Sequence, residues 1–401
     1  MPLFYAISHY FNLPFRAWEQ RKLGDIANYR NGKAHEQVED EDGKYTIINS
    51  KFISTNGKVQ RYTNEQVEPI FDGEIAMVLS DLPNGKALAK LFLVKEDGKY
   101  TLNQRIAGIT PNENIDPIFL NFRMNRNNYF LKFDSGVTQT NLSKSQVENF
   151  IALYPTFDEQ YKIGLFFTQL DDTIALHQRK LDALKLMKKA FSQQIFPENN
   201  RKKPKIRFTS FYEEWEQRKI GEYGYFYYGK SAPKWSVAQD ATTPCVRYGE
   251  LYTKFGPEID IVHSYTNIDK SNLKFSSGNE VLVPRVGENP LDFANCSWLS
   301  ISNVAIGEMI SVYNTEQYPL FIAYYFRSKM KYEFAKRVEG GNVSNLYYSY
   351  LEDILISVPS IEEQKKIAEF LNKIDITINL LQNKLGRIKE LKKAYLQNMF
   401  I

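Results

Sequence analysis

The stretch Trp18-Glu19-Gln20-Arg21-Lys22 recurs later in the chain as Trp215-Glu216-Gln217-Arg218-Lys219. The offset between the two is 215 − 18 = 197 residues, and Gly32-Lys33 returns as Gly229-Lys230 at the same offset. An internal repeat identifies one structural unit that is used more than once. The 401-residue chain is therefore predicted to contain two copies of a single unit.

The two copies match again toward their ends, at an offset of 345 − 141 = 204 residues. The matched residues include Asn141-Leu142 with Asn345-Leu346, Pro155 with Pro359, Glu159-Gln160 with Glu363-Gln364, Asp171 with Asp375, and Lys188-Lys189-Ala190 with Lys392-Lys393-Ala394. The residues between these matched ends differ widely. This pattern predicts a common frame with two different recognition surfaces, although neutral drift in loops is an alternative source for part of the divergence.

A long helix is predicted at the end of each copy. Thr156 with Glu159, and Ser360 with Glu363, have the spacing of a capping box directly after a proline. Acidic residues follow in the first turn and lysines near the end, and both placements complement the helix dipole. At 1.5 Å per residue, each helix is expected to be roughly 60 Å long.

Apolar residues in both helices recur at alternating intervals of three and four, which is the pattern of a coiled-coil seam. The predicted seam residues are Phe167, Leu170, Ile174, Leu181, Leu184, Leu371, Ile374, Ile378, Leu385 and Ile388. Two equivalent seams in one chain are expected to pack on each other as an antiparallel pair. His177 is interpreted as a tolerated polar position in the seam. Lys188 and Lys392 interrupt the seams at equivalent places, either by extending toward solvent or by facing a partner.

The predicted organisation is an N-terminal segment 1–14, a module 15–155, a helix 156–200, a basic linker 201–214, a second module 215–358 and a helix 359–401. Short β-prone runs alternate with turns in both modules, and each module has one aromatic, helix-like stretch, 118–130 or 319–338. The expected fold class is α+β. The linker is interpreted as a solvated charge run, with contact to a phosphate backbone as the alternative.

Two corresponding loop regions, segments 134–141 and 339–345, are rich in polar residues. Their Gly, Asn, Gln, Ser and Thr residues suit either an ordinary turn or a loop that reads base edges. The Gly-Lys pairs suit either a solvated turn or a phosphate contact. Candidate DNA-binding residues are Lys33, Arg123, Arg126, Gln139, Thr140, Asn141, Lys144, Lys230, Arg327, Lys331, Asn342, Ser344 and Asn345.

Composition excludes several classes of protein. The net charge of +4 is too small to indicate nucleic-acid binding by itself, and the 26 tyrosines are mostly expected in cores, with some on a binding surface. Cys245 and Cys296 do not form a zinc-binding pattern, and two lone thiols fit a reducing cytoplasm. No phosphate-binding loop, amino-methyltransferase motif, catalytic triad or apolar run of membrane-spanning length is found.

The chain resembles the specificity subunits of type I restriction-modification systems. The resemblance rests on the duplicated W-E-Q-R-K-[LI]-G-[DE], on N-L before each P-[TS]-[FI]-[DE]-E-Q, and on the shared helix ending K-K-A-[FY]-x-Q-x-[IM]-F. It implies two target recognition domains separated by an antiparallel helical spacer, with each domain reading one half of a split DNA sequence.

The same resemblance implies that the chemistry belongs to other subunits. Two methyltransferase subunits would dock on this chain, and restriction subunits would complete the nuclease. S-adenosylmethionine, ATP and Mg²⁺ are expected on those partners, and no cofactor is expected on this chain. Two other hypotheses stay open from the residues alone, namely a coiled-coil scaffold that binds protein or carbohydrate and a stand-alone enzyme.

Overall fold

The computed structural model describes residues 18–400 except positions 36, 84, 199–200, 231 and 239, so the predicted segment 1–14 lies outside the described residues. By its internal contacts the chain divides into two compact units. The first unit contains residues 18–177 and 384–400, and the second contains residues 178–383. Each unit therefore holds one module, half of its own long helix and half of the other one.

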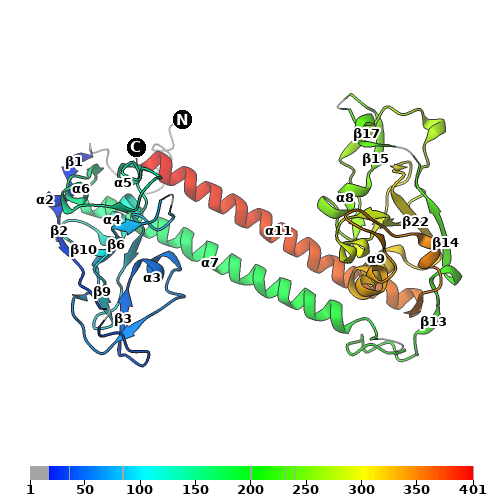
Figure 1. Ribbon diagram of the computed structural model, residues 1–401, viewed down its shortest axis with the longest axis horizontal. Helices are drawn as coiled ribbons and strands as arrows, with labels where there is room; N and C mark the ends of the chain where they lie inside the picture. Colours follow the sequence, from blue (N-terminus) through cyan, green and yellow to red (C-terminus); the bar gives the residue numbers. More distant parts are fainter. Residues whose placement is uncertain are drawn as a thin grey trace. The chain divides into compact units, whose positions relative to one another are not determined.

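The first module alternates short strands and short helices (Figure 1). Its elements are β1 (Glu19–Lys22), α2 (Leu23–Ile26), β2 (Ala27–Asn31), β3 (Tyr45–Ile48), α3 (Ser50–Ser54), β4 (Tyr62–Thr63), β5 (Pro69–Ile70), β6 (Ile75–Val78), β7 (Ser80–Asp81), β8 (Leu91–Leu93), β9 (Tyr100–Leu102), β10 (Ile106–Pro111), α4 (Pro117–Met124), α5 (Asn128–Leu131), β11 (Thr140–Asn141), α6 (Lys144–Glu148) and β12 (Ile151–Tyr154). The long helix α7 (Phe157–Gln194) follows.

The second module repeats this order almost element by element. Its elements are β13 (Glu216–Lys219), η1 (Ile220–Glu222), β14 (Gly224–Tyr228), η2 (Lys234–Ser236), β15 (Thr243–Val246), α8 (Tyr248–Thr253), β16 (Glu258–Ile259), β17 (Ser264–Thr266), η3 (Lys270–Asn272), β18 (Glu280–Pro284), β19 (Val286–Gly287), η4 (Pro290–Ala294), β20 (Ser297–Leu299), β21 (Ala305–Ile306), β22 (Ile310–Thr315), α9 (Pro319–Lys329), α10 (Lys331–Ala335), β23 (Glu339–Gly340), β24 (Ser344–Asn345), η5 (Tyr348–Tyr350) and β25 (Leu355–Val358). The long helix α11 (Ile361–Met399) follows.

A mostly antiparallel sheet lies at the centre of each module. Its strand order is β2-β10-β6-β8 in the first module and β14-β22-β18-β20-β16 in the second. A smaller sheet contains the parallel pair β3·β9 in the first module and β15·β21 in the second. The buried face of the central sheet packs against α4 or α9, which explains the aromatic content of these two helices.

Strand register shows that the repeat is structural and not only sequential. Lys22 pairs with Ile151 in the β1·β12 ribbon, and Lys219 pairs with Leu355 in β13·β25. Lys219 follows Lys22 by 197 residues, and Leu355 follows Ile151 by 204 residues. These are the two offsets of the sequence repeat. The duplicated W-E-Q-R-K motif therefore forms the same ribbon in both units, and the predicted α+β fold with an internal repeat is confirmed.

A glutamine that is repeated at the start of each long helix ties that helix to its module. The buried Gln160 donates to the carbonyl of Pro155 at 2.9 Å and accepts from the amide of Asp116, the N-cap of α4, at 3.1 Å. Gln364 donates to the Pro359 carbonyl at 2.8 Å and accepts from the amide of Tyr318, the N-cap of α9, at 2.9 Å. A buried amide group without a hydrogen-bond partner would cost free energy. Each glutamine therefore holds the start of its long helix against the N-cap of α4 or α9.

The glutamates beside these glutamines differ from the predicted capping boxes. Glu363 is buried, and its carboxylate accepts two hydrogen bonds of 2.8 Å from Arg207 in the basic linker. Glu159 instead accepts from the indole Nε1 of Trp18 at 3.2 Å. Of the two predicted capping residues, only Ser360 accepts such a contact within the described part of the chain, from the Glu363 amide at 3.4 Å. The linker thus contributes Arg207 to the structure, which the reading of this segment as a solvated charge run did not anticipate.

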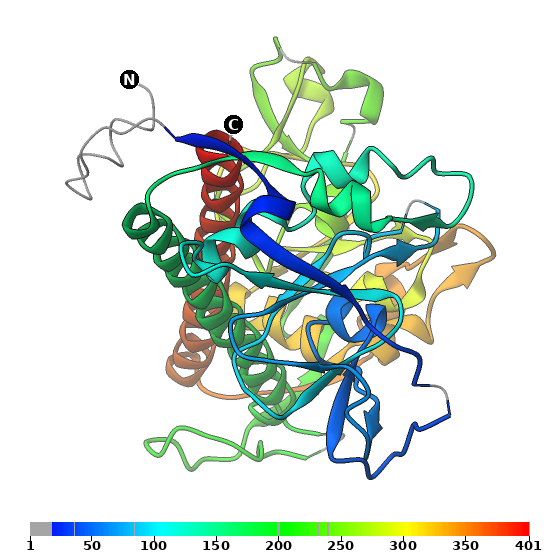
Figure 2. The ribbon, with the colours of Figure 1, turned by 90° about the vertical axis from the view of Figure 1, so that its left-hand side faces the viewer.

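The two long helices are antiparallel, because each unit pairs the start of one helix with the end of the other. In the first unit the Phe166 ring lies 5.2 Å from that of Tyr395, and Figures 1 and 2 show these helix ends side by side. In the second unit Phe191 and Phe370 are 5.0 Å apart. All ten predicted seam residues are buried or half-buried, which confirms the coiled-coil pattern.

Both lysines that interrupt the seams form ion pairs with the opposite helix. Lys188 pairs with Asp375 in the second unit, and Lys392 pairs with Asp171 at 2.5 Å in the first. Asp375 also accepts a 2.8 Å hydrogen bond from the buried Tyr324 hydroxyl of α9. The sequence suggested that these lysines extend toward solvent or face a partner. The structure shows instead that they form ion pairs between the two long helices.

We predict that Asp375→Asn destabilises the second unit. The change removes the ion pair and weakens the acceptor of Tyr324, so the free energy of unfolding should fall by about 1–3 kcal/mol. Asp171→Asn, at the equivalent and more exposed position, should cost less. Chemical denaturation followed by circular dichroism measures both values. Equal losses in the two variants would contradict the role given to Tyr324.

Candidate nucleic-acid interface

The polar segment 134–141 of the first module folds back as an ordered ribbon. Strand β11 pairs with β7, and Asn141 lies opposite Ser80. Asp134 accepts hydrogen bonds from the Gly136 amide at 2.9 Å and from the Thr140 hydroxyl at 3.2 Å, so Thr140 points inward and is buried. Side chains alternate along a strand, and Gln139 and Asn141 are accordingly exposed.

An amide pair is thereby presented at the edge of the first module. Gln139 donates from Nε2 to the Ser80 hydroxyl at 2.6 Å, which orients the Gln139 side chain. Asn141 accepts a longer contact from the same nitrogen at 3.5 Å. Exposed and oriented amides suit hydrogen bonding to adenine in the major groove.

The equivalent segment 339–345 of the second module forms the ribbon β19·β24·β23. Asn345 lies opposite Val286, just as the equivalent Asn141 lies opposite Ser80 in the first module. Ser344 is buried and donates to the Gly341 carbonyl at 3.2 Å, while Asn342 is exposed. Ser344 and Thr140 are thus structural members of the two ribbons, and Asn342 and Asn345 are the candidates with accessible groups.

The glycine of each Gly-Lys pair has a steric explanation. A Cβ atom on Gly32 would lie 2.1 Å from the Asn103 carbonyl oxygen, and one on Gly229 would lie 2.1 Å from the Gly307 carbonyl oxygen. No side chain fits at such a distance, so glycine is required where the chain leaves β2 or β14. The repeated glycine therefore reflects close backbone approach and not a phosphate cradle.

The two lysines of these pairs are exposed and have different neighbours. Lys33 forms a 3.1 Å ion pair with Glu68, and Lys230 donates to the Ser271 carbonyl at 3.4 Å. The candidate Lys144 is also exposed, with Glu148 at 3.6 Å. Lys331, at the start of α10, is exposed as well. These four lysines stay candidates for contacts to a phosphate backbone.

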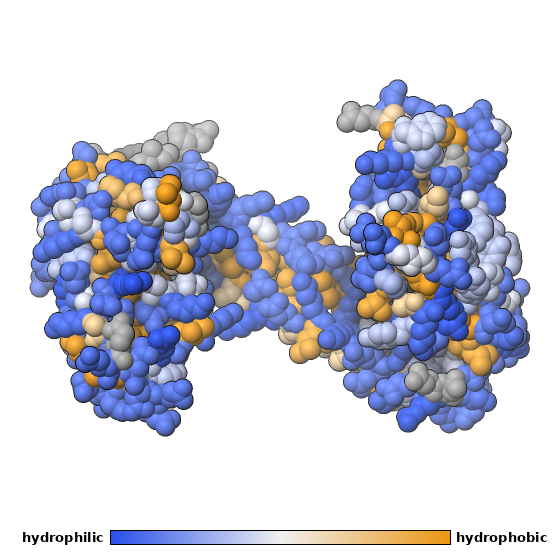
Figure 3. Space-filling view, in the orientation of Figure 1, coloured by the Kyte–Doolittle hydropathy of each residue, from blue (hydrophilic) through white to orange (hydrophobic). Residues whose placement is uncertain are grey.

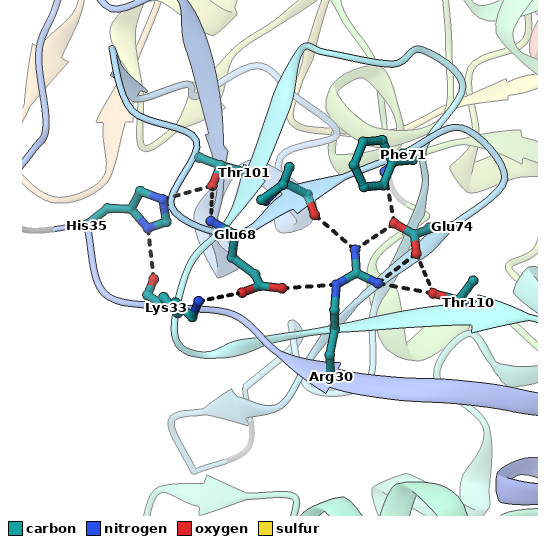
Figure 4. Close-up of polar contacts among 9 residues, drawn as sticks. Arg30, Lys33, His35, Glu68, Phe71, Glu74, Thr101 and Thr110 are labelled. Atoms are coloured by element: carbon teal, nitrogen blue, oxygen red, sulfur yellow. Dashed lines mark hydrogen bonds and ion pairs between the residues drawn. The ribbon is translucent and has the colours of Figure 1, made fainter.

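A partly buried ion-pair network supports β2, the strand that precedes Lys33 (Figure 4). Arg30 donates to both carboxylate oxygens of Glu74 at 2.6 Å and to Glu68 at 3.1 Å. Burial raises the pKa of Glu74, but hydrogen bonds from Arg30, Thr110 and the Phe71 amide outweigh it and leave the pKa below its ordinary value. His35 is buried beside the network, with ring nitrogens 2.8 Å from the Lys33 carbonyl and 3.0 Å from the Thr101 hydroxyl.

Two of the predicted DNA-binding arginines have internal roles instead. Arg123 is buried, donates to the Phe400 carbonyl and stacks 5.2 Å from the Phe400 ring. Arg327 donates to the Cys296 carbonyl at 2.5 Å and the Gly256 carbonyl at 2.9 Å. Burial lowers the pKa of both guanidinium groups. Both arginines were candidates for DNA contacts, but their side chains lie inside the fold.

Arg126 differs from these two arginines. It is half-buried, has a left-handed backbone with φ of 51°, and lines a pocket of about 550 Å³ in the first unit. Its Nη1 atom is buried and has no hydrogen-bond partner among the residues that the structure describes. The structure therefore leaves Arg126 as a candidate, although not at the polar ribbon.

A cation on an aromatic surface in the second module was missed by sequence reasoning. The guanidinium carbon of Arg285 lies 4.5 Å from the Tyr228 ring centroid and 6.0 Å from that of Tyr347. Tyr348 packs on Tyr228 with ring centroids 4.6 Å apart. The tyrosine-rich runs 225–228 and 347–350 were visible in the sequence, but nothing in the sequence placed them beside Arg285.

The described residues also lack the features of two other classes of protein, membrane-spanning proteins and metal-binding proteins. None of the described helices has the length and apolar content that crossing a membrane requires. In the same part of the chain, no cluster of three or more His, Cys, Asp or Glu side chains could hold a metal ion. Both cysteines are buried and unpaired, and burial raises the pKa of the Cys245 thiol to about 11.

Comparison with known proteins decides among the hypotheses. Residues 16–186 and 212–390 match the family model of the type I restriction modification DNA specificity domain. The chain belongs to this family. Its function is accordingly the recognition of DNA sequence as the specificity subunit of a type I restriction-modification system, and the scaffold hypothesis is set aside.

Relatives of full length agree with this assignment. Two proteins of Methanocaldococcus jannaschii, named as specificity subunits of the type I restriction enzymes MjaX and MjaVIII, are each 25% identical over 402 residues. The matches cover 94% of this chain and 91% or 90% of the relative. The crystal structure of a type I S subunit from M. genitalium has a TM-score of 0.61 at 12% identity and covers 97% of this chain and 98% of its own. That likeness shows the fold.

We predict that Glu74→Gln destabilises the first module in a pH-dependent way. The folded pKa of Glu74 is below its ordinary value, so the ion pair stabilises the fold at neutral pH, and this contribution is lost as pH falls through the folded pKa. The variant should lose roughly 3 kcal/mol near pH 7. The difference from the unmodified chain should be constant above the ordinary glutamate pKa of 4.5 and should shrink as pH falls below it.

Urea denaturation at several pH values measures this difference. Glu65→Gln is the matched control, because Glu65 is an exposed glutamate of the same module. A loss for Glu74→Gln that stays constant with pH would show that the ionised carboxylate is not what stabilises the network.

Proposed function

We propose that this specificity subunit recognises one bipartite, asymmetric DNA target, with one module on each half of it. The supporting observation is that the two modules have the same frame and register, while equivalent positions of their polar ribbons have different chemistry. The first ribbon presents the amides Gln139 and Asn141. The second presents Asn345 beside Arg285 and two tyrosines. Because the two modules share a frame but present different side chains, we expect them to recognise different half-sites.

The chemistry of modification and restriction belongs, in this proposal, to other subunits. Methyl transfer to adenine from S-adenosylmethionine would be carried out by two copies of a methyltransferase subunit. Cleavage driven by ATP with Mg²⁺ would be carried out by restriction subunits. The sequence supports this division because it lacks both a phosphate-binding loop and the usual amino-methyltransferase motif. The chain itself would be non-catalytic.

Exposed apolar residues on the long helices support docking of two identical partners. Leu176 in α7 corresponds to Leu380 in α11, and Met187 corresponds to Leu391, at the offset of 204 residues. All four side chains are exposed, and Figure 3 shows apolar patches over the long helices on a mostly hydrophilic face. Exposed apolar positions that recur in both copies are what two equivalent protein contacts require.

We predict that Leu176→Glu and Leu380→Glu each weaken the docking of one methyltransferase subunit. A charge on an apolar contact is costly to desolvate, so complexes should shift from two partner subunits per chain toward one. Native mass spectrometry of the reconstituted complex measures this ratio. Leu186→Glu is the matched control, since Leu186 is exposed but its counterpart in the other copy is Glu390. Equal disruption by the control would contradict this docking surface.

The proposed target recognition is tested by sequencing the methylated adenines of the host genome, with and without the gene for this chain. We expect one methylated motif to disappear on deletion, consisting of two unlike half-sites separated by an unread gap. Reintroducing the gene should restore that motif. Persistence of every bipartite methylated motif after deletion would contradict the proposal, and methylation of DNA by the purified chain alone would contradict its non-catalytic role.

A further inference from the structure

Arg285 occupies a fixed position at the junction of β18 and β19. Its amide donates to the Met309 carbonyl at 3.2 Å, and its carbonyl accepts from the Leu346 amide at 2.8 Å. These two bonds hold the backbone between the central sheet and the polar ribbon. The side chain therefore starts from a defined point next to Asn345, which pairs with Val286.

The side chain of Arg285 lies against aromatic rings and not against a carboxylate. Its guanidinium carbon lies 4.5 Å from the Tyr228 ring centroid, within the range of a cation–π contact, and the Tyr347 ring follows at 6.0 Å. Burial raises the pKa of Tyr228 despite the nearby cation, so this ring stays a neutral phenol at physiological pH. Tyr348 stacks on Phe226 with an interplanar angle of 3° and completes the platform.

The hydrogen-bond donors of Arg285 are unused within the described part of the chain. Its Nε is buried there without a partner, and no ion pair to Arg285 is found among the described residues. Other shielded arginines of the second unit are satisfied, Arg207 by Glu363 and Arg337 by Glu333. A guanidinium has five N–H donors in a planar fork, and an aromatic face satisfies none of them. The two terminal Nη groups of the fork are therefore the donors that an acceptor outside the chain could reach.

The first module has the same backbone position but different chemistry. Leu79 donates to the Arg105 carbonyl at 3.0 Å and accepts from the Leu142 amide at 2.8 Å, which are the contacts that Arg285 makes with the equivalent residues. Leu79 is buried. At this backbone position, the first module therefore has the apolar side chain of Leu79, and the second module has the guanidinium group of Arg285.

We infer that Arg285 reads a guanine in the half-site recognised by the second module. A bidentate arginine on the O6 and N7 atoms of guanine is the commonest specific contact in the major groove. The aromatic platform favours this over a phosphate contact, because it restricts the fork to one plane, whereas the exposed Lys230 nearby suits a phosphate. This inference rests on the proposed function, since it needs the second module to contact base edges.

The test compares two substitutions of Arg285 in the reconstituted complex with methyltransferase subunits. Arg285→Leu gives the second module the residue that the first module has at this position. Arg285→Lys keeps the charge but removes the bidentate fork. Binding is measured by competition among duplexes that vary one base pair at a time across the target found for the unmodified complex.

Both variants should lose discrimination at one guanine of the second half-site, by roughly 5- to 150-fold. Preference at the first half-site should be unchanged, which also serves as the control for folding of the complex. Lys230→Ala is the matched control for a phosphate contact. It should weaken binding to all duplexes alike and reduce the salt dependence of binding.

Three results would overturn the inference while leaving the proposed function intact. One is a second half-site that contains no guanine on either strand. Another is uniform weakening by Arg285→Leu with an unchanged base preference, which would identify a phosphate contact. The third is full discrimination retained by both variants. A complex of the unmodified chain that recognises no bipartite target would instead contradict the proposed function, and the inference with it.

Discussion

Reciprocal ion pairs between the two long helices are the interaction on which the rest of the structure depends. Lys188 pairs with Asp375 in the second unit, and Lys392 pairs with Asp171 in the first. All four groups are at least partly shielded at an otherwise apolar seam, so shifting one helix by a turn would leave the charges without partners. The same helix ends contribute Phe167 and Leu371 to the cores of the modules. Helix register and module packing are therefore set together.

Most of this frame could be predicted from the sequence. The seam residues follow from apolar spacing alone, because a helix buries whatever recurs every three to four residues. The β1·β12 and β13·β25 ribbons were not predicted, because the repeated W-E-Q-R-K motif supplies only the first strand of each ribbon and its partner strand lies far along the chain. The roles of Gln160 and Gln364 could not be predicted, because their partners at the N-caps of α4 and α9 are distant in the sequence.

The candidate site was predicted only in part, for a physical reason. Composition identified polar ribbons, but alternation along a strand, and not residue type, decides that Thr140 and Ser344 are buried. Arg123 and Arg327 were candidates for DNA contacts because of their charge, yet they donate to backbone carbonyls inside the fold. Arg285 follows a buried strand and gave no local signal, because the rings that orient it come from other strands and turns. A single sequence shows which groups can bind a base, whereas the fold decides which ones are free to do so.

The two modules share one frame, and their DNA-reading surfaces are separable from it. The most direct measurement replaces residues 215–358 by a second copy of residues 18–154 and determines the methylated motif of the resulting complex. We expect a target made of two copies of the first half-site in inverted orientation, separated by an unchanged gap. A folded, partner-bound chain that keeps the original second half-site would contradict this expectation, because recognition would then reside in the helices or linker and not in the modules.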